Sequence, residues 1–437
     1  MTTSKKAENV RDVIRYLQKF KNALLVIYLD DKTISSPLFS SHIRDIALLH
    51  QAGLKVVLIQ GARRRIDEVL NNANIKWTYN DGIRVTSTEA MPLIKMAAFD
   101  VSNTVMTCLA ANNITAVIGN WVRARGKGVL GGFDYGTAGE IDKLETEAIC
   151  TVLNDGFIPI FPCIGWNAAG HPYNISSMLL AKQVAMNLKA DKLFFMLFNE
   201  EINAQHYAIP EGFALSETGN IPAMNLEEVD KFIEKNFSEN GDIKNILKAA
   251  QEACHAGVTR VHILNGNMDG VLPCEIFSGL GSGTMIYTGG YGKVRKMEQT
   301  DIPSVLGIMK PFIESGKLLN RTEAQLSDSL EDFIVYELDG GIHACAALHF
   351  YEDGQAEIAA VAVDENYAHM GIGPKLIDNL IEQAGEGEAS SIFIMTTQTA
   401  DWFEQLGFEE DVLESIPEAR RKLWDSRRAS KVYRLKK

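Results

Sequence analysis

The chain has 437 residues, a formal net charge of −13 at pH 7 and 46% hydrophobic residues. This length is too great for one ordinary hydrophobic core and favours two domains. The acidic balance argues against a nucleic-acid-binding protein, which usually needs a basic face, and no run approaches the roughly 18 apolar residues of a membrane span. We therefore expect a soluble, cytoplasmic protein that acts on a small molecule, without nucleic-acid or membrane partners.

The six cysteines show no close metal-type spacing and lie mostly in apolar runs. We expect reduced, buried thiols and no metal site. These residues are Cys108, Cys150, Cys163, Cys254, Cys274 and Cys345.

Residues 1–22 precede the first predicted strand, and residues 7–22 are predicted to form an amphipathic helix. Apolar residues recur there at helical spacing within an otherwise charged segment. The apolar face of such a helix needs a partner surface. Another subunit and the helix's own domain both remain open as that surface.

Residues 23–287 alternate between apolar strand-like runs and helical patterns. This alternation implies parallel strands with crossover helices, and therefore an open α/β sandwich. A polar, acidic stretch from about 199 to 246 predicts a partly helical insertion at the edge of the sheet. Clustered glycines at 288–292 predict the linker to the next domain. The strand-like runs are 23–29, 54–60, 114–119, 157–161, 192–198 and 260–264.

Residues 293–437 are predicted to form a second domain, in which a glycine turn follows the strand at 356–363. The turn ends in Gly371-Ile372-Gly373, and an amphipathic helix then runs over 374–384. Glycines let the backbone approach an anion closely, Pro374 suits the first helical position, and the amides of a helix start favour a diphosphate. A Gly-x-Gly pattern alone is more often a plain strand-to-helix turn, so the rest of the domain decides between the two.

The order of elements in this domain resembles the GNAT acetyltransferases, which bind acetyl-CoA. Strands are expected at 333–337, 342–350, 356–363, 391–396 and near 430–435, with helices at 322–331, 374–384 and 399–406. The family's loop signature usually starts with a polar or basic residue, where this chain has Ala368. The resemblance implies an α+β GNAT fold and a cofactor site made of Ala360, Val361, Val363, Ala368, His369, Met370, Gly371, Ile372 and Gly373.

Acyl transfer from a thioester to an amine needs a neutral amine, a donor for the developing oxyanion and a proton for the thiolate. Glu357 lies on the strand before the glycine turn, where a carboxylate could take the ammonium proton directly or through water. Many GNAT enzymes protonate the thiolate with a Tyr four residues before a Gly-Phe pair. This chain has Phe403 there, ahead of Gly407-Phe408. Glu357 is therefore the predicted base, and the general acid is unassigned.

Guanidinium groups at Arg321 and Arg428, with the hydroxyl of Ser430, are suited to holding carboxylates. The Arg428-Ala429-Ser430-Lys431 run and the earlier arginine resemble the acetyltransferase domain of the N-acetylglutamate synthase family. The resemblance implies that these three residues, Arg321, Arg428 and Ser430, contact an L-glutamate substrate.

The first domain carries five short matches, in order, to the amino-acid kinase fold: residues 61–66, 82–86, 122–135, 139–140 and 190–193. They resemble the kinase-like domain of bacterial N-acetylglutamate synthases. Phosphoryl transfer needs a glycine-rich turn and a lysine, whereas Asp30 and Asp31 put two negative charges where phosphates would lie. Kinase activity is therefore expected to be absent.

The segment from Gly257 to Thr284 resembles the effector site of arginine-sensitive members of this fold. The resemblance implies that Glu275 pairs with the guanidinium of L-arginine, that Gly281 approaches the ligand and that His262 contributes. The helix at 7–22 matches arginine-regulated relatives in which it joins dimers into a ring. A homo-oligomer is implied, with a hexamer as one expected assembly.

The resulting hypothesis is an α/β protein with an amino-acid kinase-like open α/β sandwich followed by a GNAT-fold α+β domain. It would transfer acetyl from acetyl-CoA to the α-amine of L-glutamate and open arginine biosynthesis, under arginine feedback inhibition. A GNAT enzyme acting on another amino acid or amine remains an alternative, as does a non-catalytic arginine or acetyl-CoA sensor. ATP turnover by an acetylglutamate kinase is disfavoured by Asp30 and Asp31.

Overall fold

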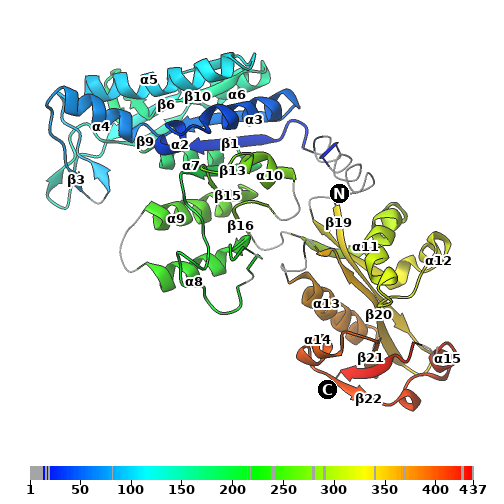
Figure 1. Cartoon of the computed structure of the whole chain (residues 1–437). Helices are drawn as coiled ribbons and strands as arrows, with labels where there is room; N and C mark the ends of the chain where they lie inside the picture. Colours follow the sequence, from blue (N-terminus) through cyan, green and yellow to red (C-terminus); the bar gives the residue numbers. More distant parts are fainter. Residues whose placement is uncertain are drawn as a thin grey trace. The chain divides into compact units, whose positions relative to one another are not determined.

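The computed structural model divides the chain into two compact units, Met1–Gly289 and Gly290–Lys437 (Figure 1). The predicted helix at 7–22 lies largely outside the described part of the chain. The structure describes residues 13–14, 17, 20–80, 82–213, 215–216, 218–237, 242–277, 281–288, 292–338, 341–365, 367, 371–424 and 428–435.

The first unit is built on an eight-stranded sheet. The strand order is β14-β16-β15-β13-β1-β2-β10-β5, and the strands pair in parallel except where β15 meets β16. After β1 the chain first adds β2 on one side of β1, and it later returns to add β13 on the other side. The order of strands therefore reverses between β1 and β13, which makes this a topological switch point. The bounds are β1 Leu24–Leu29, β2 Lys55–Gln60, β5 Ala116–Ile118, β10 Ile158–Phe161, β13 Lys192–Leu197, β14 Ala223–Asn225, β15 Arg260–Asn265 and β16 Thr284–Tyr287.

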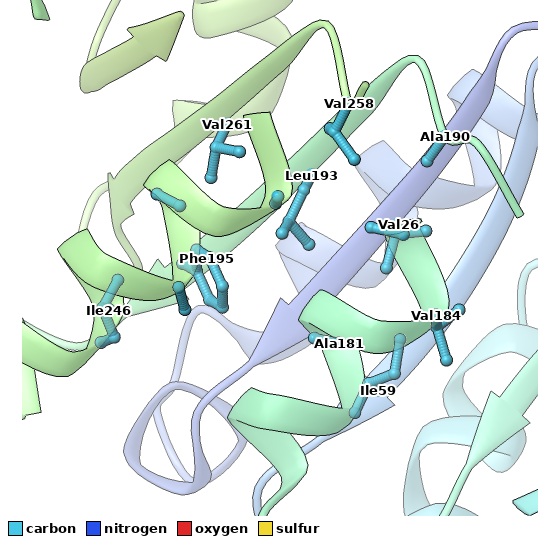
Figure 2. Packing of buried hydrophobic residues seen from close by; sticks show 14 of the residues in the cluster. Val26, Ile59, Ala181, Val184, Ala190, Leu193, Phe195, Ile246, Val258 and Val261 are labelled. Atoms are coloured by element: carbon cyan, nitrogen blue, oxygen red, sulfur yellow. The ribbon is translucent and has the colours of Figure 1, made fainter. Parts of the chain in front are cut away.

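Helices cover both faces of this sheet, because its central strands are apolar on both sides. Val26 and Ile59 contribute to one core together with Ala181 and Val184 of α7 (Figure 2). Leu25, on the other face of β1, belongs to a separate core built with α3, α5 and α10. The helices of the first core are α6 Thr146–Asn154, α7 Ser177–Asn187, α8 Leu226–Asn236 and α9 Asp242–His255; those of the second are α3 Phe39–Gln51, α5 Met91–Ala110 and α10 Val271–Phe277.

The helix α5 is apolar and long enough, by length and composition alone, to cross a membrane. Its buried residues include Ile94, Ala97, Val105 and Leu109, which pack in cores of the first unit. A core helix passes the same test of length and composition. Packing in these cores accounts for its apolar sequence.

Smaller elements complete the first unit. Helix α4 follows β2, and a four-stranded sheet has the order β12-β11-β6-β9 beside the hairpins β3-β4 and β7-β8. Their bounds are α2 Asp31–Ile34, α4 Arg63–Asn72, β3 Tyr79–Asn80, β4 Ile83–Arg84, β6 Val122–Gly126, β7 Val129–Leu130, β8 Phe133–Asp134, β9 Gly139–Leu144, β11 Ile164–Trp166 and β12 Pro172–Asn174.

The second unit is built on a seven-stranded sheet of order β17-β18-β19-β20-β21-β23-β22. Only β20 and β21 pair in parallel. Helices α11 and α12 lie over one face and α13 and α14 over the other. The bounds are β17 Lys293–Lys296, α11 Ile302–Glu314, α12 Glu323–Asp328, β18 Phe333–Leu338, β19 Gly341–Phe350, β20 Gln355–Val363, α13 Ile372–Glu386, β21 Ser391–Thr396, α14 Ala400–Gln405, β22 Phe408–Asp411, α15 Glu418–Arg421 and β23 Lys431–Leu435.

Two expectations about details are wrong. Helix α13 begins at Ile372, so Pro374 is its third residue rather than its first; proline is tolerated there because N–H groups of the first turn have no intrahelical partner. Cys150 and Cys274 are exposed, whereas Cys163, Cys254 and Cys345 are buried as expected.

Asp30 and Asp31 satisfy backbone amides at the ends of β1, β2 and β13. Asp30 caps α2 by accepting from the Thr33 amide at 2.6 Å, and its other oxygen accepts from the Phe198 amide at 3.1 Å. Asp31 accepts from the amide of Arg64 at 2.7 Å, at the start of α4. Carboxylates of the chain itself therefore take amide donors that could otherwise bind an anion.

Replacing Asp30 by Ala is expected to lower the free energy of unfolding of the first unit by about 1–3 kcal/mol, because it removes a helix cap and leaves the Phe198 amide unpaired. Urea denaturation followed by circular dichroism measures this. Lys32→Ala is the control, since Lys32 is exposed on the same short helix. Equal stability of the Asp30 and Lys32 variants would contradict the capping role.

Candidate functional site

The glycine turn of the second unit ends at a helix start with free space beside it. Gly371 has φ 64°, a left-handed conformation that favours glycine. A methyl group at Gly371 would meet no other atom within 4 Å, whereas one at Gly373 would lie 2.9 Å from the ring of Trp402. Gly371 therefore permits the turn and Gly373 permits the packing of α14. Ala368, His369 and Met370 lie outside the described residues.

The two parallel strands β20 and β21 separate beside this helix start. Their pairing runs from Gln355 to Ile358 on β20 and ends at Ile394 on β21, although β20 continues to Val363. The partner strand β19 shows a register irregularity between Cys345 and Ala347. Ala360, in the separated part of β20, has φ 52°, which is strained for a residue other than glycine. The separation provides strand edges for an extended ligand, at Ala360, Val361 and Val363.

Glu357 lies within the last paired stretch of β20 and is almost fully buried. Its side chain is 5% exposed, and its Oε2 accepts two hydrogen bonds. Tyr351 Oη donates at 2.6 Å and Arg420 Nε donates at 2.7 Å. The predicted base is therefore held in an ion pair by a residue of the short helix α15.

The groups around Glu357 are electrostatically coupled. Burial and the Glu357 carboxylate raise the pKa of Tyr351 well above its ordinary value. Burial alone would lower the pKa of Arg420, but its hydrogen bond to Glu357 and their opposite charges outweigh that effect, so the pKa is raised. Tyr351 thus stays a hydrogen-bond donor and Arg420 stays a cation at neutral pH.

Arg321 lies in the same environment as Glu357. Its guanidinium stacks over Phe333, 5.2 Å from the ring centroid. Burial lowers the pKa of Arg321, against the opposing effect of Glu357, Cys345 and Asp332. The structure therefore brings the predicted base and one predicted substrate contact into electrostatic contact.

Arg428 and Ser430 lie just before β23. The Nη2 of Arg428 donates to the carbonyls of Gly316 and Lys317, at 3.2 and 3.0 Å, and so docks on the loop after α11. Its Nε is buried without a partner in the described part of the chain. Trp424 Nε1 donates to the carbonyl of Ser430 at 3.3 Å. Arg428 is thus partly engaged by the backbone, which its sequence pattern did not indicate.

Phe403 fills the position where a general acid was sought. It is 6% exposed and packs edge-to-face against Trp402 and Phe408. It has no proton to give and belongs to the core of the unit. Two hydroxyls instead lie before α14: Thr396 at the end of β21 and Thr399 at the start of the helix, with their oxygens 2.8 Å apart.

The three predicted effector residues of the first unit meet in one buried cluster. His262 on β15 and Glu275 on α10 share a 2.6 Å hydrogen bond between Nδ1 and Oε1. Oε2 of Glu275 accepts from the amides of Ser282 and Gly283 at 2.6 and 2.9 Å. Gly281, with φ 64°, has no room for a side chain, because a methyl group would lie 2.9 Å from that same oxygen.

Electrostatics determine the proton positions in this cluster. Burial lowers the pKa of His262 below its ordinary value. Burial alone would raise the pKa of Glu275, but the hydrogen bonds from His262, Ser282 and Gly283 outweigh it and the pKa is lowered. A neutral His262 therefore donates from Nδ1 to an ionised Glu275. Its Nε2 is then an acceptor, buried and without a partner among the described residues.

A separate cavity of about 580 Å³ lies at the carboxyl ends of the first unit's strands. Lys32, Arg63 and Arg64 line it together with Asp31 and Asp67. Asp31 is bonded to the Arg64 amide, and Asp67 pairs with Arg84. The site where this fold class binds ligands is thus present and carries its own carboxylates.

Known proteins match both units. Residues 26–204 match the amino acid kinase family, and residues 329–410 match the acetyltransferase (GNAT) domain. The chain is 31% identical over 427 residues to the amino-acid acetyltransferase of Actinobacillus pleuropneumoniae serotype 7 (strain AP76), with 95% of each chain covered. The chain belongs to the amino-acid acetyltransferase family.

Further relatives support the same family assignment of this amino-acid acetyltransferase. That of Vibrio vulnificus (strain CMCP6) is 32% identical over 438 residues, with 96% of each covered. The solved N-acetylglutamate synthase of Neisseria gonorrhoeae, complexed with coenzyme A and L-arginine, is 28% identical with a TM-score of 0.79, covering 98% of this chain and 99% of that one. The same enzyme complexed with coenzyme A and N-acetyl-glutamate gives a TM-score of 0.61. The predicted fold class and enzyme class are confirmed.

Sequence patterns did not reveal Tyr351 and Arg420 of this acetyltransferase. Tyr351 lies only six residues before Glu357, beyond the end of β19, and looks like an ordinary aromatic residue at a turn. Arg420 is 63 residues away and sits among other charged residues. The apolar neighbours of Glu357 were the one available signal, because a carboxylate in such a strand needs a partner when buried.

The pKa shifts at the His262–Glu275 cluster predict that acid destabilises the first unit. Because the folded-state pKa of His262 is below its ordinary 6.5, the unfolded chain binds more protons below about pH 6.5 and stability falls as the pH falls. Glu275 acts in the same direction below its ordinary 4.5. Between pH 6.5 and 5.5 the loss from His262 is at most about 1 kcal/mol, the limit for a histidine that stays neutral in the folded state.

Unfolding free energies of wild type and His262→Asn at several pH values measure this. The variant should lose less stability on acidification, since asparagine does not titrate. His206→Asn, which changes an exposed histidine of the same unit, is the control and should keep the wild-type slope. Equal slopes for the His262 variant and wild type would contradict the prediction.

Proposed function

We propose that this protein transfers the acetyl group of acetyl-CoA to the α-amine of L-glutamate, giving N-acetyl-L-glutamate for arginine biosynthesis. The observation that carries the proposal is the buried carboxylate of Glu357 at the point where β20 and β21 separate. The gonococcal relative, complexed with coenzyme A and with N-acetyl-glutamate, supports this choice of cosubstrate and product.

The residues around the glycine turn fit acetyl-CoA. The amides of Gly371, Ile372 and Gly373 belong to the start of α13, where N–H groups have no intrahelical partner and attract a diphosphate. Space is open at Gly371. The separated edge at Ala360, Val361 and Val363 would bind the extended pantetheine arm. Ala368, His369 and Met370 are proposed to complete the loop.

Glu357 acts as the general base in this proposal. It takes one proton from the glutamate ammonium, directly or through water, and the neutral amine attacks the thioester carbonyl carbon. A C–N bond forms as the C–S bond breaks. Because Phe403 has no proton to give, the leaving thiolate takes up the second proton that the amine loses.

Arg321, Arg428 and Ser430 are proposed to hold the carboxylates of glutamate. The Nε of Arg428 is a buried donor without a partner among the residues the structure describes, and such a donor is stabilised by an incoming carboxylate oxygen. Arg321 adds a second guanidinium beside Glu357. Two cations suit a substrate with two carboxylates.

The kinase-like unit is proposed to bind L-arginine as a feedback inhibitor. Ionised Glu275 would pair with the ligand guanidinium, while the Nε2 of neutral His262 offers an acceptor and Gly281 allows close approach. The relative complexed with L-arginine supports this ligand. We further propose a cytoplasmic homo-oligomer, a hexamer, joined through residues 7–22.

CoA release from acetyl-CoA is expected with L-glutamate and not with a panel of other amino acids, and L-arginine should reduce it. Glu275→Ala should raise the arginine concentration for half-inhibition at least about tenfold, since the ligand loses a charge-assisted pair. A thiol-reactive dye measures release. CoA release with a different amino acid would identify that amino acid, and not glutamate, as the acceptor. If acetyl-CoA binds and no CoA is released with any amino acid, the result would favour a non-catalytic sensor.

Glu357→Gln is expected to lower kcat about a hundredfold or more, because the amide cannot take the ammonium proton but keeps an oxygen for Tyr351 and Arg420. Steady-state kinetics measure this, and calorimetry should give an unchanged Kd for acetyl-CoA. Glu352→Gln, an exposed nearby carboxylate, is the matched control. An unchanged kcat in the Glu357 variant would exclude this residue as the base.

A further inference from the structure

The carboxylate proposed as the base is not free in the structure. One oxygen, Oε2 of Glu357, accepts from both Tyr351 and Arg420. The Arg420 side chain is 16% exposed and that of Glu357 is 5% exposed, so water screens the ion pair poorly. An oxygen that already accepts from two donors has both of its lone pairs engaged. Arg420 must therefore leave Oε2 before that oxygen can take the amine's proton.

Glu357 is the carboxylate that two guanidinium groups share. It opposes the effect of burial on the pKa of Arg321 and it raises the pKa of Arg420. The positive charge of Arg420 in turn lowers the pKa of Arg321, because the two cations repel each other. A second carboxylate arriving beside these guanidiniums would relieve that repulsion.

The other polar neighbours of Glu357 have partners of their own. His349 is directly opposite Glu357 on β19, and its Nδ1 is bonded to Asp332 at 2.8 Å. Tyr351 is neutral and donates to Glu357. Of the two nearby guanidiniums, Arg420 is the one hydrogen-bonded to Glu357 in the described part of the chain.

We propose that the acceptor carboxylate held by Arg321 also takes Arg420 from Glu357, and that this exchange frees Glu357 to accept the amine's proton. The inference rests on the proposed role of Glu357 as base. Arg420 remains paired throughout, which avoids the large penalty of leaving a buried charge without a partner. Tyr351 stays on Oε2 and keeps the carboxylate in position.

Arg420 and Glu357 lie on elements that differ in how they are held. Glu357 is paired with strands on both sides, opposite His349 on β19 and Phe393 on β21. Arg420 belongs to α15, a helix of only four residues. The proposed exchange therefore requires the Arg420 side chain to turn, while β20 holds Glu357 in the sheet.

The exchange makes acetyl transfer depend on the acceptor's charge. An amine without a carboxylate leaves Arg420 on Glu357, so its ammonium meets an engaged base. An acceptor with a carboxylate supplies the replacement partner. The same proton then moves from ammonium to Glu357, the C–N bond forms, the C–S bond breaks, and the thiolate gains the second amine proton.

Arg420→Met tests the exchange with two acceptors, L-glutamate and propylamine. The variant removes the guanidinium and keeps an apolar stem. For glutamate, kcat/KM should fall at least about tenfold with the lost carboxylate contact; for propylamine, it should rise about tenfold as Glu357 is freed.

Three further variants distinguish this exchange from a structural role of Arg420. Tyr351→Phe removes a neutral donor from the same oxygen and should lower kcat/KM for both acceptors by a similar factor. Arg421→Met changes an exposed arginine of the same helix and should change neither value. Arg420→Lys keeps a cation and should fold like wild type, and it should not gain activity with propylamine.

The outcomes distinguish the inference from the function on which it rests. If Arg420→Met binds acetyl-CoA normally but loses activity with both acceptors in parallel, the exchange is wrong. If it does not fold, a gain of propylamine activity by Arg420→Lys overturns the proposal and its absence supports it. If Glu357→Gln retains full activity with glutamate, the assignment of the base fails first.

Discussion

The proposed acetyl-transfer site depends on the loss of pairing between β20 and β21 beyond Ile358 and Ile394. Up to that point the two strands are held by a parallel ladder, and beyond it each strand offers unpaired backbone groups to a ligand. The irregular register opposite Cys345 and the positive φ of Ala360 are local costs of this separation. The rigid paired part positions Glu357, and the open part provides the space beside it.

Carboxylates with donors supplied by the fold occur in both units of the molecule. In the kinase-like unit, the partly buried Asp30 and Asp31 satisfy amides at strand and helix ends, and the buried Glu275 binds the amides of Ser282 and Gly283. In the acetyltransferase unit, the buried Glu357 binds Tyr351 and Arg420. The donors matter most for Glu275 and Glu357, since an unpaired buried charge is very unfavourable.

The same contacts agree with the expected absence of kinase activity in the first unit. Phosphoryl transfer requires amides and cations free to hold phosphates, and Asp30 and Asp31 occupy amides at the carboxyl ends of the strands. In the second unit, space is open beside the helix start at Gly371. The two units thus differ in whether carboxylates of the chain take the backbone donors at these positions.

The sequence by itself determined the alternation of strands and helices, because apolar periodicity is a local property that the chain carries before folding. The strands at 23–29, 54–60, 192–198 and 356–363 differ from the observed ones by a residue or two. Glu357 was indicated by its place on the strand before the glycine turn, and Glu275 and His262 by the resemblance of residues 257–284 to the effector site of arginine-sensitive relatives.

The tertiary structure alone decided which partners these groups have. Arg420 reaches Glu357 across 63 residues, and Arg428 reaches the carbonyls of Gly316 and Lys317 across more than a hundred. Which of several nearby arginines meets a carboxylate depends on how strands, loops and short helices pack. Spacing along the chain carries no information about that packing, so the ion pair at the proposed base became visible only in the folded molecule.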